Sequence, residues 1–109
     1  FRSIRVGVIR CHSAAITLKL KREVSEAEFA DLVAHAHPWV NYVPNNKEES
    51  VSKLTPAYIS GSLQVGIGRY KKMSLNNDPI YSVLTVGDQL LWGAAEPLRR
   101  MLNILLGRV

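Results

Sequence analysis

The chain has 109 residues, of which 47% are hydrophobic and 21% charged, the balance of one ordinary globular domain. No apolar run approaches the about 20 residues that a membrane-spanning helix needs, and a single cysteine cannot form an internal disulfide, so we expect a cytoplasmic protein. The net charge of +5 is compatible with anionic substrates, phosphorylated cofactors or nucleic acid and selects none of them.

The amino-terminal part of the chain is strand-like. It begins at Phe1 without a signal-peptide pattern, which we interpret as a cut through a longer protein. Residues 2–10 are predicted to form one strand. Residues 14–21 alternate between apolar and polar side chains, the period-two pattern of a half-buried strand. The tripeptide Cys11-His12-Ser13 lies between these two segments.

A helix is predicted next. Ser25 is a suitable N-cap, because Glu28 follows at capping-box spacing. One apolar stripe then continues at helical spacing through Phe29, Leu32, Val33 and Ala36. Pro38 is expected to end the helix, since proline disfavours helical geometry in the residue before it. Residues 39–43 are a short strand candidate, and the polar residues 44–50 are predicted as a loop.

The middle of the chain holds two further strands. Residues 51–60 stay ambiguous, although Thr55-Pro56 favours a turn or an irregular segment. Residues 62–71 alternate again and are predicted as a strand. Turn-forming side chains dominate residues 74–79, and residues 80–86 form the last predicted strand.

A helix closes the chain. Asp88 is a plausible N-cap, Pro97 should kink or restart the helix, and Gly107 suits its end. A wide apolar stripe comprises Leu90, Leu91, Ala94, Ala95, Leu98, Met101, Leu102 and Leu105. The resulting order β-β-α-β-β-β-α predicts an α+β fold with a mixed or antiparallel sheet covered by helices. Residues 1–86 would form this domain, and residues 87–109 the helix that leaves it.

Two residues near the amino terminus are candidates for chemistry. His12 stands at a strand end, where a rigid sheet can present a side chain for proton transfer. Arg5 can hold a carboxylate with two parallel hydrogen bonds. The two lie seven positions apart, an odd number, so a regular strand would point them to opposite faces. A bulge near Gly7, or a strand that ends by Arg10, would be needed to bring them together.

Other reactive residues are interpreted as structural. Cys11 is adjacent to His12 on a strand, so the two side chains should point apart, and a lone buried cysteine is usually inert. His35 and His37 do not share a helix face, so no metal site is expected. The Gly66–Gly68 segment lacks the third glycine of a dinucleotide loop, which favours close packing or a bulge.

Three segments carry distinctive motifs. Residues 5–13 read RVGVIRCHS, LTPA at 54–57 is followed by GSL at 61–63 and GR at 68–69, and residues 85–102 read TVGDQLLWGAAEPLRRML. All three resemble the matching segments of aspartate-semialdehyde dehydrogenases of Gram-negative bacteria. The last segment matches nearly residue for residue, and the resemblance runs the full length of the chain.

The resemblance implies an enzyme that reduces aspartyl 4-phosphate to aspartate 4-semialdehyde and phosphate with NADPH, on the pathway to lysine (through diaminopimelate), methionine and threonine. It implies a homodimer with a Rossmann domain and an α+β catalytic and dimerisation domain like that of glyceraldehyde-3-phosphate dehydrogenase. His12 matches the family's general acid/base, Arg5 its carboxylate-binding arginine, and Gln89 a glutamine near the cofactor. The closing helix would return to the NADP-binding domain.

Parts of the family's machinery have no counterpart in this sequence. The nucleophilic cysteine, which forms a thioester with the substrate, lies upstream in the family, and Cys11 does not correspond to it. The glycine-rich cofactor loop is missing as well, and Ala14 stands where close relatives commonly have glutamine. We therefore predict that this chain alone turns over no substrate.

Two other functions stay open. A related acyl-phosphate reductase, such as N-acetylglutamyl-phosphate reductase, would use similar chemistry, but DQLLWGAA at residues 88–95 matches that family poorly. A small basic RNA-binding module is supported only by the positive charge. The favoured interpretation includes neither a nucleic acid nor a membrane as partner.

Overall fold

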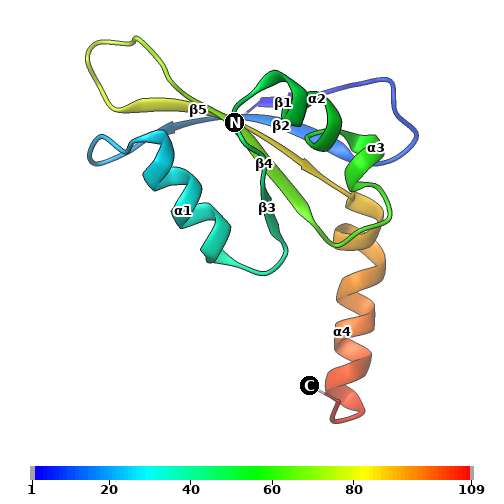
Figure 1. Ribbon diagram of the computed structural model, residues 1–109. Coiled ribbons are helices and arrows are strands. Elements are labelled where there is room, and N and C mark those ends of the chain that lie inside the picture. The colour runs from blue at the N-terminus through cyan, green and yellow to red at the C-terminus, as the bar shows by residue number, and fades with distance from the viewer. Residues whose placement is uncertain (1, 109) are drawn as a thin grey trace.

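The computed structural model describes residues 2–108, with side chains from residue 5 onward, and contains one five-stranded sheet flanked by helices (Figure 1). Its elements are β1 (Arg2–Ile4), β2 (His12–Lys19), α1 (Glu26–Ala36), β3 (Val40–Tyr42), α2 (Lys47–Lys53), α3 (Pro56–Ile59), β4 (Val65–Lys72), β5 (Ile80–Gly87), the π-helical turn η1 (Leu91–Ala95) and α4 (Glu96–Leu105). The strand order is β1-β2-β5-β4-β3, and only β3 and β4 pair in parallel. The predicted α+β class with a mixed sheet is confirmed.

The core occupies both faces of the sheet, because successive side chains of β5 point to opposite sides. On the α1 face, Tyr70 stacks on Phe29 and on Tyr81, with ring centroids 4.0 Å and 4.7 Å apart. The cluster on the α2–α3 face consists of Val43, Leu54, Ile59 and Val86, with Leu84 packed against it. Each face of the central strands is therefore covered by a different helical segment.

The glycines of β4 allow the α2–α3 face to pack closely. A Cβ atom on Gly68 would lie 3.1 Å from the Val43 carbonyl oxygen, and one on Gly66 would lie 3.3 Å from Ile59 Cδ1. The pairing with β5 then shifts between Gly68 and Lys71, a bulge that contains Arg69 at φ +57°. Both predictions for the glycine pair, close packing and a bulge, are confirmed.

The predicted strand over residues 2–10 is wrong beyond Ile4. Strand β1 pairs antiparallel with the start of β2, from Arg2 opposite Ala15 to Ile4 opposite Ser13. Since β2 begins at His12, a longer β1 would have almost no partner to bond. Residues 5–11 instead form an irregular loop, on which the apolar side chains of Val6, Val8 and Ile9 are exposed.

The predicted loop at residues 44–50 and the ambiguous stretch after it contain two short helices. Asn46 caps α2 by accepting a hydrogen bond from Glu49 N–H at 2.8 Å. Thr55 caps α3 in the same way, with Pro56 in the first helical turn, where its missing N–H is no loss. The caps were visible in the sequence, but seven and four residues are too few to show helical periodicity.

Helix α1 and the following turn agree with the prediction. Ser25 Oγ accepts a hydrogen bond from Glu28 N–H at 3.2 Å, and the helix ends at Ala36, before Pro38. The apolar stripe is only partly covered, since Leu32 is 57% exposed. Two turn residues before β5, Asn76 and Asn77, adopt positive φ angles.

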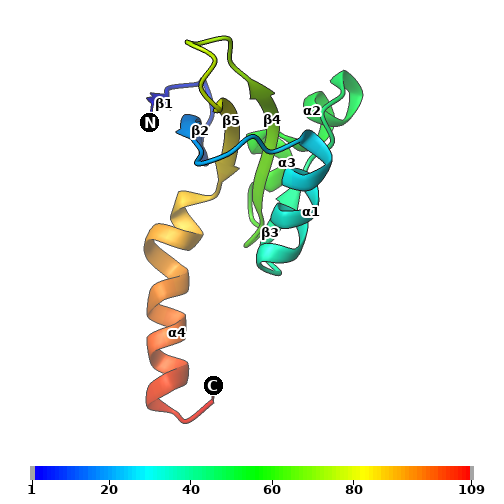
Figure 2. The ribbon, with the colours of Figure 1, turned by 90° about the vertical axis from the view of Figure 1, so that its left-hand side faces the viewer.

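The closing helix leaves the sheet and extends away from it (Figure 2). Its first turns form the π-helical turn η1, where Glu96 N–H bonds the Leu91 carbonyl, directly before Pro97. A wider turn relieves the clash between a proline ring and the preceding turn, which explains the predicted interruption. Most of the predicted stripe is exposed on α4, as it is at Leu98, Met101, Leu102 and Leu105. No helix within residues 2–108 is long and apolar enough to cross a membrane.

The base of α4 is held by an aromatic and charged cluster. The Arg100 guanidinium lies 3.9 Å from the Trp39 ring centroid, and Trp39 packs edge-on against Trp92. Trp92 Nε1 donates to the Leu63 carbonyl at 3.1 Å. Glu96 is 4% exposed and accepts hydrogen bonds from Arg99 and Arg100, which lower the pKa of Glu96 to about 2.

Replacing Gly68 with alanine should destabilise the protein. The added Cβ would press against the Val43 carbonyl and the Leu54 side chain, so we expect a loss of about 1–3 kcal/mol in the free energy of unfolding. Gly87→Ala is the matched control, because a Cβ there meets nothing within 4 Å. Urea unfolding measures both, and equal effects of the two variants would contradict the packing argument.

The Glu96 carboxylate should contribute a pH-dependent part of the stability. Its folded-state pKa of about 2 lies below the ordinary 4.5, so its contribution is complete above that ordinary value and is lost as the pH falls toward 2. Glu96→Gln should therefore be less stable than the parent at pH 7, and the difference should shrink below about pH 4.5. Urea unfolding at several pH values tests this, and a difference independent of pH would refute it.

Candidate active site

The three residues singled out in the sequence, Arg5, His12 and Gln89, line one open hollow of about 300 Å³. They come from different parts of the chain: the loop after β1, the start of β2 and the segment after β5. The remaining lining residues are Val6, Val8, Ile9 and Cys11. The structure thus brings all three predicted site residues together.

Sheet pairing explains how His12 and Gln89 meet. His12 lies opposite Gly87 in the antiparallel β2–β5 pair, and Gln89 follows two residues later. The His12 Nδ1 and Gln89 Oε1 atoms are 3.2 Å apart, a hydrogen bond between residues 77 positions apart in the sequence. The register of two central strands therefore builds one side of the hollow.

Arg5 reaches the same hollow because β1 ends before it. The odd spacing between Arg5 and His12 would place them on opposite faces only if the strand were regular throughout. The strand ends at Ile4, so the backbone of residues 5–11 is free to turn. Of the two solutions expected from the sequence, a strand that ends by Arg10 is the one observed.

The contact with Gln89 has a consequence for the His12 ring. An amide oxygen accepts hydrogen bonds and cannot donate them, so this contact is a hydrogen bond in the tautomer that carries its proton on Nδ1. In a neutral imidazole the other nitrogen, Nε2, then has a free lone pair. His12 is exposed at the hollow, and this tautomer is the one that accepts a proton through Nε2.

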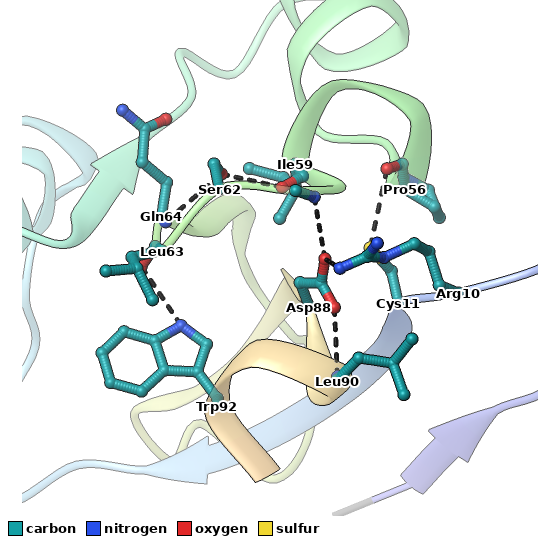
Figure 3. A network of polar contacts seen from close by, with 11 residues as sticks. Arg10, Cys11, Pro56, Ile59, Ser62, Leu63, Gln64, Asp88, Leu90 and Trp92 are labelled. Carbon is teal, nitrogen blue, oxygen red and sulfur yellow. Dashed lines mark hydrogen bonds and ion pairs between the residues drawn. The ribbon is translucent and has the colours of Figure 1, made fainter. Parts of the chain in front are cut away.

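Directly before Gln89 in the sequence, a buried carboxylate joins three segments of the chain (Figure 3). Asp88 is fully buried, and its Oδ2 lies 2.5 Å from an Arg10 guanidinium nitrogen. The same oxygen accepts from Gly61 N–H at 2.8 Å, while Oδ1 accepts from Leu90 N–H at 3.1 Å. The bond to Leu90 confirms the predicted N-cap, whereas Arg10 and Gly61 were not predicted to be partners of Asp88.

The environment of Asp88 favours its charged form. Burial by itself would raise the pKa of Asp88, but the hydrogen bond from Gly61 and the pairing with Arg10 outweigh it, so the pKa lies below its usual value. A permanent negative charge therefore sits directly before Gln89. Arg10, in the motif at residues 5–13, was the feature of the sequence that could have indicated a charged partner for Asp88.

Cys11 faces the protein interior, in agreement with its structural interpretation. Its side chain is 7% exposed, and Sγ donates to the Pro56 carbonyl at 3.6 Å. Burial raises the pKa of the Cys11 thiol, and the Asp88 charge raises it further. A protonated thiol is a poor nucleophile. The backbone at Cys11 has φ +77°, which turns the chain between Arg10 and His12.

Few of the described residues are suited to a metal or a nucleotide. Within residues 2–108 no group of three or more His, Cys, Asp and Glu side chains gathers at one point. His35 contacts Asp31, and the His37 ring packs against Trp39. Neighbouring residues occupy the space beside Gly66 and Gly68, so these glycines leave no room for a phosphate. Gln89 is exposed and lines the hollow beside His12.

Comparison with known proteins identifies the family of this chain. Residues 2–92 match the family model described as the semialdehyde dehydrogenase dimerisation domain. A solved structure, the aspartate semialdehyde dehydrogenase from Francisella tularensis, is 48% identical and superposes with a TM-score of 0.83. The match covers 93% of this chain but 28% of that one, so the chain spans little more than a quarter of its relative. The chain belongs to the semialdehyde dehydrogenase dimerisation domain family.

Proposed function

We propose that this chain is the carboxy-terminal portion of an aspartate-semialdehyde dehydrogenase, a cytoplasmic enzyme that reduces aspartyl 4-phosphate to aspartate 4-semialdehyde with NADPH. The product would feed the synthesis of lysine, methionine and threonine. The observation that carries the proposal is the convergence of Arg5, His12 and Gln89 on one hollow. A relative of that name at 48% identity supports the substrate class.

His12 would act as the general acid and base. Its Nε2 lone pair can take a proton from a thiol, and the resulting imidazolium can return one to an oxygen that develops negative charge. Gln89 fixes the ring through Nδ1, so Nε2 stays directed away from that contact. The thiol that becomes a thioester would come from the rest of the enzyme, since Cys11 is buried and protonated.

Arg5 would bind the carboxylate of the amino-acid substrate. Its guanidinium lies on the wall of the hollow that holds His12 and is exposed, so a bidentate pair can form without displacing another group of the wall. Holding the carboxylate fixes the distance from the reacting carbonyl to His12. Such positioning lowers the entropic cost of the reaction.

The remaining parts of the site would come from outside this chain. When bound, NADPH supplies the hydride that reduces the acyl group. Among the described residues, Gln89 would contact the nicotinamide end, and the rest of the cofactor requires a nucleotide-binding domain. We propose that the exposed apolar side of α4, with Leu98, Met101 and Leu105, packs on that domain, and that the sheet domain forms a homodimer. The chain alone would then be inactive.

Replacing His12 with glutamine in the complete enzyme should lower kcat by roughly 10²- to 10⁴-fold, the usual contribution of general acid–base catalysis. KM should change little, because the ring manages protons and does not hold the carboxylate. His35→Gln is the control, since His35 is an exposed histidine of α1 that does not line the hollow. A His12→Gln enzyme within a few-fold of the parent kcat would refute this role.

Replacing Arg5 with lysine should raise KM for aspartate 4-semialdehyde roughly 10- to 100-fold, the cost of one lost charge-assisted hydrogen bond. Arg22→Lys is the control, because Arg22 pairs with Glu28 and lies beyond the opposite end of β2 from His12. The assay measures oxidation of the semialdehyde with phosphate and NADP+. A parent enzyme that prefers N-acetylglutamate semialdehyde would instead support the related reductase.

A further inference from the structure

We propose that Arg10 and Asp88 are positioning residues for the reaction, a buried ion pair that holds the loop carrying Arg5 against the helix start carrying Gln89. The inference rests on the proposed function and extends it to residues that touch no substrate. Neither residue lines the hollow, yet each is the direct sequence neighbour of a segment that does. The pair thus connects the segments that form the two sides of the hollow.

The geometry makes this pair the strongest link between those two sides. The hydrogen bond between His12 and Gln89 is exposed to water and does not involve the loop of residues 5–11. Asp88 is 0% exposed, and the Arg10 side chain is 35% exposed. Asp88 has no access to water, so moving the Arg10 side chain away leaves a buried negative charge without its counterion.

Asp88 acts on Gln89 through the backbone. Its Oδ1 caps the first turn of the closing helix at Leu90 N–H, and Gln89 is the residue between the cap and that N–H. Its Oδ2 accepts from Gly61 and from Arg10. The carboxylate thus fixes the backbone on both sides of Gln89. This in turn places the Gln89 side-chain amide, which orients His12.

Arg10 acts on the opposite wall. The loop of residues 5–11 has no strand partner and exposes its apolar side chains, so it lacks the usual restraints of a hydrophobic core. Two contacts hold its end: Arg10 to Asp88, and Cys11 Sγ to the Pro56 carbonyl. The positive φ of Cys11 is a strained conformation that persists only when its neighbours are held in place.

The test uses the complete enzyme with Arg10→Gln, Asp88→Asn and the double variant. Each single change should lower kcat by roughly 10- to 100-fold, since small misplacements of catalytic groups cost this much. The double variant should lose no more than the worse single variant, because both changes break the same link. Arg10→Lys keeps the charge and should recover part of the lost kcat.

A stability control separates positioning from folding. Tyr70→Phe removes a buried hydrogen bond to the Val24 carbonyl near the opposite end of β5 from the site. It should destabilise the fold and leave kcat unchanged. The positioning role is refuted if Tyr70→Phe lowers kcat as much as Arg10→Gln does when the two variants have the same free energy of unfolding. It is also refuted if the kcat loss of the Arg10→Gln/Asp88→Asn double variant equals the two single losses combined.

A spectroscopic measurement gives a readout that is independent of turnover. Nitrogen-15 NMR of labelled histidine should show a protonated Nδ1 and a free Nε2 for neutral His12 in the parent, and a mixture of the two tautomers in Arg10→Gln or Asp88→Asn. An unchanged His12 signal in the folded Arg10→Gln enzyme, together with unchanged kcat, would overturn the inference. A parent without dehydrogenase activity would refute the proposed function instead, while the tautomer shift would still decide the positioning role.

Discussion

The antiparallel register of β2 and β5 is the constraint on which the rest of the site depends. It sets His12 opposite Gly87, so the two residues that follow β5 arrive directly beside the histidine. Asp88 turns inward to cap the closing helix and bind Arg10, and Gln89 turns outward to the imidazole. A shift of one residue would reverse which of them faces the hollow, because strand side chains alternate between faces.

The site combines side chains from a well-packed sheet with one side chain from a loosely packed loop. The tyrosine and valine clusters on the two faces stabilise the central strands and contain none of the proposed catalytic groups. The loop of residues 5–11 carries Arg5, and its only described anchors are at its end. The charge of Asp88 is favoured by its donors despite burial, so the anchor persists through the neutral pH range.

The sequence predicted most of the sheet and the three site residues for identifiable reasons. Alternation is a strong local signal in residues 14–21, 62–71 and 80–86, where one strand side is buried. The roles of His12 and Gln89 came from resemblance, since spacing alone offered only a histidine at a strand end. The strand predicted over residues 2–10 failed because its length depends on where its partner begins. Arg10 was missed because its partner is distant in the chain and visible only in three dimensions.

The closing helix is attached to the sheet domain at one end, through Trp39, Trp92 and Arg100, and the same helix begins at the residue that contacts His12. From Gln89 to Leu105 it measures about 25 Å at the usual helical rise. The helix is therefore held at its base by these contacts, and the rest of it extends away from the sheet. The exposed far end of α4 and the glutamine that contacts the imidazole are therefore parts of one continuous helix, with the wider π-helical turn between them.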